Sequence, residues 1–353
     1  MMKPTLVLSI FTAFVSVASQ LCLGGTHPSV VSEIITNYSP KECDGSPQAI
    51  AAAGTAFIKS LPDARRKEAA LPFESAERAK WTNIPPRGEE GGVRLGDLDK
   101  EHIQLACDLL NAVMSQQGYE KSRDVMLGDD KLLPNGKPRP GFGAANFWLA
   151  VFGDPSADKP WAIQLDGHHI AVNITLVGES ISMSPTFIGM QPHKFLFKGN
   201  EIVPMAGEVE DAFAFVAALS EDQKAAAIVA QKRGDVQTAA GKDGFIPEPK
   251  GLKCDILTEA QKNALLKLTA HWVNNLPAKQ ADARMKEIAG QINYCQFAWS
   301  GPTAPGSDIS FILQGPSLII EYSCQDLGGK PLDHLHSMYR DPSNEYGSRI
   351  VSK

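Results

Sequence analysis

Apolar residues recur at helical spacing through the first third of the chain. After Asp99, a predicted N-cap, one apolar stripe is built from Ile103, Ala106, Leu109, Leu110 and Val113. Ser46 followed by Pro47 predicts the start of an earlier helix, because proline suits the first helical position. Ser220 and Thr258 are predicted caps of two later helices. His271 falls within the second of these and is interpreted as structural.

Residues 161–177 alternate apolar and polar positions and predict two antiparallel strands. Asp166-Gly167 predicts the turn between them, because glycine tolerates the positive φ that such turns require. This register places His169 on the polar face beside Gln164. His168 then lies at the border of the apolar face.

Two further apolar runs, 309–313 and 318–322, predict a second hairpin with its turn at Gly315-Pro316. Pairing Leu313 with Leu318 leaves both faces partly apolar, as in central strands covered on both sides. Glu321 interrupts the second run. A buried carboxylate needs a cation, an arginine or hydrogen bonds to offset its desolvation.

Together these patterns predict a single α+β domain over residues 25–353, with helices packed against a mostly antiparallel sheet. The domain is helical to about residue 127 and sheet-rich afterwards, with a helical insertion at about 207–290. Residues 233–253 are interpreted as a linker, and its Arg233-Gly234-Asp235 triplet as a solvated turn. No internal repeat is evident.

The N-terminus predicts an export signal over residues 1–19. Lys3 supplies the basic start, residues 6–18 the apolar core, and Ala18-Ser19 the small residues expected near cleavage. Leu21 before Cys22 does not fit a lipoprotein signal. The apolar run is short for a bilayer span, so we expect no membrane span in the mature protein and a secreted or periplasmic location.

Composition adds limits to the possible functions. The chain has 43% hydrophobic and 21% charged residues and a net charge of -6, which indicates a globular protein. No basic run indicates nucleic-acid binding, and the expected partner is a small-molecule substrate or ligand. The six cysteines form no C-x-x-C pair, so zinc-finger and thioredoxin signatures are absent.

The triplet His334-Leu335-His336 near the C-terminus is the strongest chemical signal. On a strand, His334 and His336 point to the same side, roughly 7 Å apart at the backbone. Two such imidazoles can converge on one ion at about 2.0–2.1 Å. Adding His169, with His168 as a further candidate, predicts a site for a divalent transition metal. Zinc, copper and iron all fit these ligand types.

Three other residues are candidates for catalysis. Glu321 is predicted to be a metal ligand or a base. The Asp341-Pro342 turn is expected to hold Arg340 beside the site, where the arginine can clamp an anionic group. The alternative is that Arg340 pairs with Asp341 or Glu321 and only stiffens the loop. Motifs of serine hydrolases, zinc-dependent helical proteases and nucleotide-binding loops are absent.

Six segments carry a recognisable pattern: SAERAKWTNIP, LLNAVMSQQGY, WAIQLDGHHIAVN, PTFIGMQPH, FILQGPSLIIEY and HLHSMYRDPSNEYG. Together they resemble the domain-of-unknown-function family 3500. The resemblance covers nearly all of the chain after the leader. It implies that the polar motif positions of the family are His168, His169, His334, His336, Arg340 and Asp341. Glu345 stands where the resemblance leads us to expect aspartate.

Three functions are compatible with these patterns. The first is an exported metal-dependent enzyme, with hydrolase and oxidoreductase both open. The second is a non-catalytic protein of the envelope or exterior that binds a metal or small ligand in the same cleft. The third is a structural module whose histidines only form hydrogen bonds. The first is the prediction tested below, and it requires histidines from two distant segments to meet.

Overall fold

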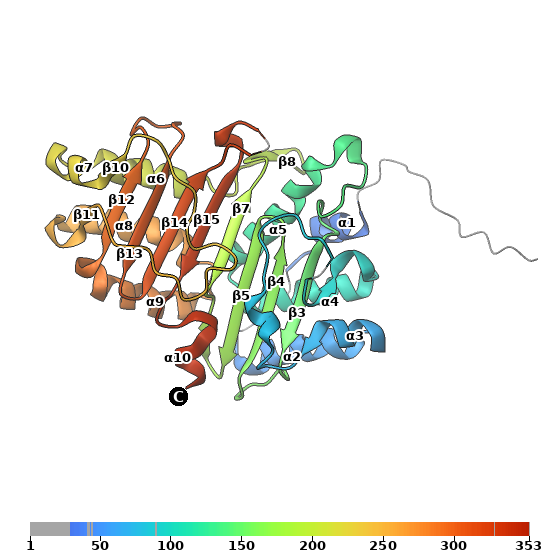
Figure 1. The fold of residues 1–353 in the computed structure, drawn as a ribbon. Coiled ribbons are helices and arrows are strands. Elements are labelled where there is room, and N and C mark those ends of the chain that lie inside the picture. The colour runs from blue at the N-terminus through green and yellow to red at the C-terminus, as the bar shows by residue number, and fades with distance from the viewer. Residues whose placement is uncertain (1–28, 41–42, 44, 89, 328, 353) are drawn as a thin grey trace, which may run out of the picture.

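The computed structural model describes residues 29–40, 43, 45–88, 90–327 and 329–352. In this part of the chain, helices pack against one large sheet, which confirms the predicted α+β class (Figure 1). The predicted signal peptide, residues 1–19, and Cys22 lie outside the described residues.

The helices begin where the sequence places caps. The described residues form α1 (Val30–Asn37), α2 (Pro47–Ser60), α3 (Asp63–Ala69), α4 (Lys100–Val113), α5 (Gln116–Asp129), α6 (Ala206–Ala217), α7 (Glu221–Ala227), α8 (Glu259–Val273), α9 (Ala278–Gln291) and α10 (Ser348–Val351). The side chains of Ser46 and Asp99 accept backbone N–H bonds at the starts of α2 and α4. Ser220 and Thr258 each form a full capping box. All four predicted caps are therefore confirmed.

The large sheet has 13 strands in the described chain. Its main order is β1 (Ala70–Leu71), β3 (Phe147–Phe152), β4 (Trp161–Gly167), β5 (Ile170–Val177), β7 (Thr186–Met190), β15 (Leu335–Arg340), β14 (Leu318–Cys324), β13 (Ser310–Gly315), β12 (Gln296–Ser300) and β10 (Ile228–Ala230). Short strands β2 (Val93–Arg94), β6 (Ser180–Ser182) and β11 (Leu252–Lys253) pair with β3, β5 and β12, and β8 (Phe195–Phe197) pairs with β9 (Asn200–Ile202) in a separate small sheet. Only β1 with β3 and β10 with β12 run parallel, so the sheet is mixed but mostly antiparallel.

The topology contains a repeat that the sequence does not reveal. The order from α2 to β7 is two helices, two short strands, two further helices and the sheet strands, and the order from α6 to β15 is the same. The pairings also repeat, because β1 and β2 flank β3 as β10 and β11 flank β12. Antiparallel pairing of β7 with β15 joins the halves into one sheet and relates them by an approximate two-fold rotation.

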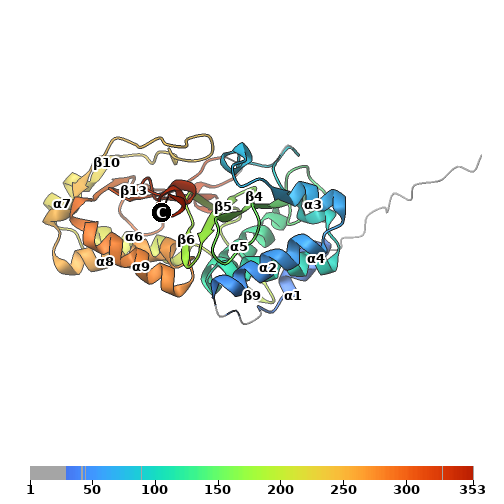
Figure 2. The same ribbon diagram turned by 90° about the horizontal axis from the view of Figure 1, so that it is seen from below.

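The two faces of the sheet are covered differently. Most helices lie on one face, where the largest apolar core is buried, and long irregular segments cross the other (Figure 2). These segments are residues 72–92 and 231–251, and we call the second the strap. The strap covers most of the predicted linker of residues 233–253, and it is bonded to the sheet as well as connecting elements. Its residues bond Glu321 and Gln314 on the sheet.

The first predicted hairpin has the wrong turn. Gly167 pairs with Ile170, so the turn residues are His168 and His169 rather than Asp166 and Gly167. The second hairpin differs in the same way, because Gly315 pairs with Leu318 and the turn is Pro316-Ser317. The pairing moves by four residues in the first hairpin and by two in the second, and both shifts leave every strand side chain on its predicted face. Face periodicity therefore cannot distinguish the two registers.

Asp166 consequently lies inside β4 instead of in a turn. Its carboxyl group is 1% exposed, and only Oδ2 is bonded, accepting from Thr82 N at 3.0 Å. Burial raises the pKa of Asp166 to about 8.

This carboxyl group predicts a pH-dependent stability. The folded protein binds the Asp166 proton more tightly than the unfolded chain does, so the free energy of unfolding falls as pH rises from about 4 to about 8. In the wild type, the free energy of unfolding should fall by roughly 1 kcal/mol per pH unit between pH 5 and pH 7, and we expect this fall to be absent in Asp166→Asn. Urea unfolding of both proteins at these pH values measures the difference. Asp154→Asn, at an exposed position, is the control and should leave the slope unchanged; equal slopes for all three proteins would contradict the prediction.

Two other features of the described chain concern membrane-spanning helices and the state of its cysteines. No helix in it is long and apolar enough to cross a membrane. The five cysteines within it, Cys43, Cys107, Cys254, Cys295 and Cys324, carry free thiols.

Candidate metal centre

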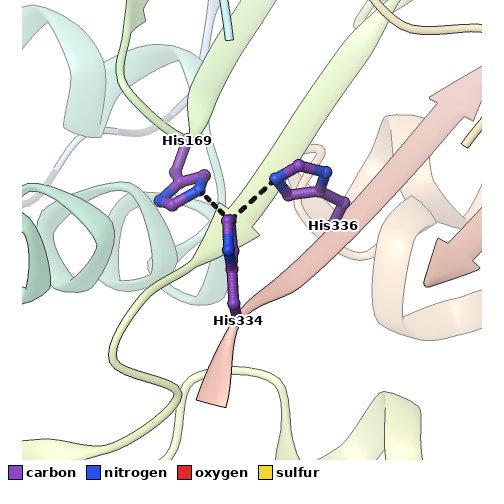
Figure 3. Close-up of side chains that lie close together, drawn as sticks. All are labelled: His169, His334 and His336. Carbon is purple, nitrogen blue, oxygen red and sulfur yellow. Dashed lines mark hydrogen bonds between the residues drawn. The ribbon is translucent and has the colours of Figure 1, made fainter. Parts of the chain in front are cut away.

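Three histidines from the two halves of the chain converge where the β4–β5 turn meets the start of β15. His169 Nε2 lies 2.7 Å from His334 Nε2, which lies 3.1 Å from His336 Nε2 (Figure 3). Ligand atoms of all three residues lie within 4.8 Å of one another. Nitrogens on one tetrahedral ion lie roughly 3.3–3.5 Å apart, so small ring movements suffice to admit an ion.

The backbone holds these rings in place from two directions. His334 is extended and precedes β15, so it points to the same side as His336, as the sequence predicts. His169 has a φ of +68°, a conformation that is uncommon and costly for a residue with a side chain. Its backbone N–H donates to Asn83 O at 3.2 Å, and its carbonyl accepts from Gly189 N at 2.7 Å.

Gly189 makes room for the rings. It pairs with His336 across β7 and β15. A Cβ atom at this position would lie 2.9 Å from His169 Cδ2 and 3.1 Å from His336 Cδ2. The absent side chain therefore lets two imidazoles approach the same point.

We expect Gly189→Ala to displace these rings. Overpacking of this kind costs about 1–3 kcal/mol of unfolding free energy, and the misplaced ligands should weaken Zn²⁺ affinity about 10–100-fold, as loss of ligand-orienting contacts does. Isothermal titration of the chelator-treated protein measures the affinity. Gly290→Ala is the matched control, because a Cβ in that helix meets nothing within 4 Å. Unchanged affinity in Gly189→Ala would contradict the proposed ring positions.

The Nδ1 atoms of His334 and His336, which are not the nitrogens that converge, also contact oxygen atoms. His334 Nδ1 lies 2.5 Å from Leu327 O, which can only accept, so Nδ1 carries the hydrogen and Nε2 presents its lone pair to the cluster. His336 Nδ1 faces Asp235 Oδ1 at 3.8 Å. Contacts to carbonyls and carboxylates of this kind orient metal-ligating histidines.

Burial favours the uncharged form of two of the three rings, His169 and His334. The pKa of His169 is well below its ordinary value because of burial and then the neighbouring imidazoles. Burial lowers the pKa of His334 to about 4. Metal ligation requires the neutral imidazole, so at neutral pH these rings need not lose a proton to bind an ion.

His168 belongs to a neighbouring group. Its ring stacks on His169 with centroids 3.8 Å apart, and its Nδ1 lies 2.6 Å from Asp129 Oδ1. Asp129, His168 and His169 form a second set of potential ligands within 4.8 Å of one another. Asp129 ends α5 and was not a candidate from the sequence.

Glu321 lies on the same sheet face as His336, opposite Met338. Its carboxylate accepts from the backbone N–H groups of Gln237 and Thr238, both at 2.9 Å, and from the Thr238 hydroxyl. It also lines a cavity of about 250 Å³ between the strap and the sheet, as does Asp235. The structure thus separates Glu321 from the histidine group and joins it to the strap.

Arg340 and Asp341 lie beyond the cluster. Arg340 is buried, pairs with Glu345, and donates to Lys242 O and Phe245 O on the strap at 3.1 and 3.0 Å. Asp341 lies on the helix side, 3.3 Å from Arg284 Nη1, beside a different cavity of about 320 Å³. These contacts match the alternative in which Arg340 stiffens the loop, with Glu345 as the partner.

Sequence reasoning missed three contributors to the site. Asp235 was assigned to a solvated turn, Gly189 was unmarked within a strand, and Asp129 was placed in a loop over residues 128–143, whereas it is the last residue of α5. A glycine inside an apolar strand run can indicate a close approach, and this was the available signal for Gly189. Nothing local marks Asp129 or Asp235, because their roles depend on contacts across the chain.

Comparison with known proteins identifies a family. Residues 44–348 match the model of the family described as "Protein of unknown function (DUF3500)". No curated protein and no solved structure shows significant similarity to the chain.

Proposed function

The chain belongs to the DUF3500 family, whose function is unknown, and we propose that it is a metal-dependent enzyme with a three-histidine centre. His169, His334 and His336 would hold one divalent transition metal. Three protein ligands leave a position for water or substrate, as in catalytic zinc sites.

The observation that carries this proposal is the convergence of three imidazole nitrogens from distant segments. The fold itself does not require histidines here, because the corresponding turn in the second half is Pro316-Ser317. Glycine would adopt the positive φ of this turn position at a lower cost than His169 does. Strained residues of this kind concentrate at functional sites.

The cavity between the strap and the sheet favours an enzyme over a non-catalytic metal-binding protein. Asp235 contacts His336 and also lines the cavity of about 250 Å³ beneath the strap, together with Glu321. Asp235 would connect a small polar substrate bound there to the histidine group. A bound metal supplies either a Lewis acid and activated water or redox chemistry, and zinc favours the first whereas copper and iron allow the second.

The alternative is a non-catalytic metal-binding protein. The observation that favours it is burial, because His169 and His334 are only 2% and 4% exposed. Closed sites with little solvent access are typical of structural metals.

Elemental analysis of the purified protein tests the metal. We expect about one equivalent of zinc, copper or iron to remain after dialysis, and a protein with none, also after reloading, would refute the centre. A screen against esters, phosphoesters, glycosides and oxidisable phenols then separates enzyme from binder. Turnover that a chelator abolishes and added metal restores supports catalysis, and retained metal without turnover supports the binder.

Export remains part of the proposal. It depends on the basic start, apolar run and small residues of positions 1–19. Cell fractionation with N-terminal sequencing of the mature protein tests it. A chain recovered in the cytoplasm with its first residues intact would refute export without affecting the metal centre.

A further inference from the structure

We propose that Asp129 and His168 form a second divalent-cation position beside the three-histidine centre. This inference depends on the proposed function, because His169 lies between the two groups. Both sets of ligand atoms fall within 4.8 Å, one comprising His169, His334 and His336 and the other Asp129, His168 and His169.

His168 does not join the first set. Two ligand atoms on one ion are at most about 4.2 Å apart, twice a metal–nitrogen bond. His168 instead faces away toward α5, with Nδ1 at 2.6 Å from Asp129 Oδ1, while its ring stacks on His169. A carboxylate oxygen and an imidazole nitrogen are ligands that zinc, iron and manganese accept.

The charges around Asp129 favour a cation. Asp129 is 1% exposed, and it adjoins a second carboxylate, that of Asp130. No lysine or arginine within the described chain forms an ion pair with either carboxylate. Asp129 is also the last residue of α5, where the helix dipole is negative and adds to the unfavourable charge.

In the second half of the fold, a contact between two neutral side chains is sufficient to connect the end of the helix to the hairpin turn. Gln291 is the last residue of α9, as Asp129 is of α5. Gln291 Oε1 accepts a hydrogen bond from Ser317 Oγ, in the turn that corresponds to His168-His169, at 2.9 Å. An amide and a hydroxyl therefore connect helix end and turn there. In the first half a carboxylate and an imidazole make this link, and Asp129 Oδ2 also accepts from Gly143 N at 2.5 Å. Both side chains are of types that bind divalent cations.

A second ion beside the first would supply a second Lewis acid for one substrate, as metal pairs do in hydrolytic enzymes. The proposed second position therefore favours hydrolysis of an ester or phosphoester over single-metal redox chemistry.

Metal stoichiometry of the full chain tests this inference. The protein is stripped with a chelator, reloaded with Zn²⁺ or Mn²⁺, desalted and analysed for metal per chain. We expect two equivalents in the wild type, one in Asp129→Asn and two in Asp130→Asn. Asp130 is the matched control, because it is a buried neighbouring carboxylate that bonds Ser32 and Ala144 and lies outside both ligand sets. Circular dichroism checks that each variant is folded.

The possible results distinguish the two proposals. One equivalent in the wild type that Asp129→Asn leaves unchanged and His336→Ala removes would overturn the second position and leave the first intact. Two equivalents retained by Asp129→Asn would also overturn it. No bound metal would refute both. If Asp129→Asn does not fold, electron paramagnetic resonance of the Mn²⁺-loaded wild type decides, because spin coupling requires two neighbouring ions and an uncoupled signal overturns the inference.

Discussion

Replacing both His334 and His336 by alanine is expected to reduce bound metal from about one equivalent or more to the background of the assay. The two substitutions remove two of the three nitrogens that converge at the β4–β5 turn. Removing a group that only orients a metal ligand lowers metal affinity about 10–100-fold. Removing two direct ligands should therefore lower the affinity more than about 100-fold. Elemental analysis and a competition titration against a chromophoric chelator measure the loss.

The control for this double variant is His271→Ala. His271 bonds Asp211 at 2.7 Å, distant from the cluster, as its structural interpretation predicts. It should lower stability without lowering metal content. If the His334 and His336 double variant remains folded and binds as much metal as the wild type, the assignment of these ligands is wrong.

Replacing Arg340 by methionine is expected to lower the free energy of unfolding by about 3–5 kcal/mol, the usual cost of breaking a buried ion pair. Arg340 is 1% exposed, and its guanidinium joins β15 to Glu345 and to two carbonyl groups of the strap. Its loss removes the cation that pairs with the half-buried Glu345 carboxylate and one donor from each of two carbonyl oxygens. Chemical denaturation of the wild type and the variant measures this loss.

The same variant separates the two roles considered for Arg340. An anchoring role predicts that the Arg340→Met and Glu345→Gln substitutions are strongly non-additive, since they remove the same ion pair. It also predicts unchanged metal stoichiometry and easier proteolysis of the strap. A variant as stable as the wild type that loses only turnover would instead support the clamp for an anionic group.

The helices and the sheet class were predictable because their signals are local. A cap, a proline at the first position and an apolar stripe act within a few residues of one another, and the structure contains all four predicted caps. Strand faces were equally accessible, since a side chain's face depends only on whether its position is odd or even. The predicted pairings were wrong by four residues in the first hairpin and by two in the second, because any even shift preserves both faces.

The candidate site was only partly predictable. His334 and His336 share a side through strand geometry alone, so the sequence identified the pair. It could not establish that His169 meets them, because β4 and β15 lie far apart in the chain and come together only through β5 and β7. Asp129 and Asp235 carry no local signal, and the signal that marks Gly189, a glycine within an apolar strand run, was missed.

The sequence by itself determined the elements, their exposed and buried faces, and the histidine pair on the last strand, because each of these follows from interactions between near neighbours. The tertiary structure alone decided the repeat of topology, the strap over the open face and the meeting of His169 with His334 and His336. These features depend on which strands pair across the whole chain. Such pairing reflects the packing of complete helices and faces, and short-range patterns do not encode it.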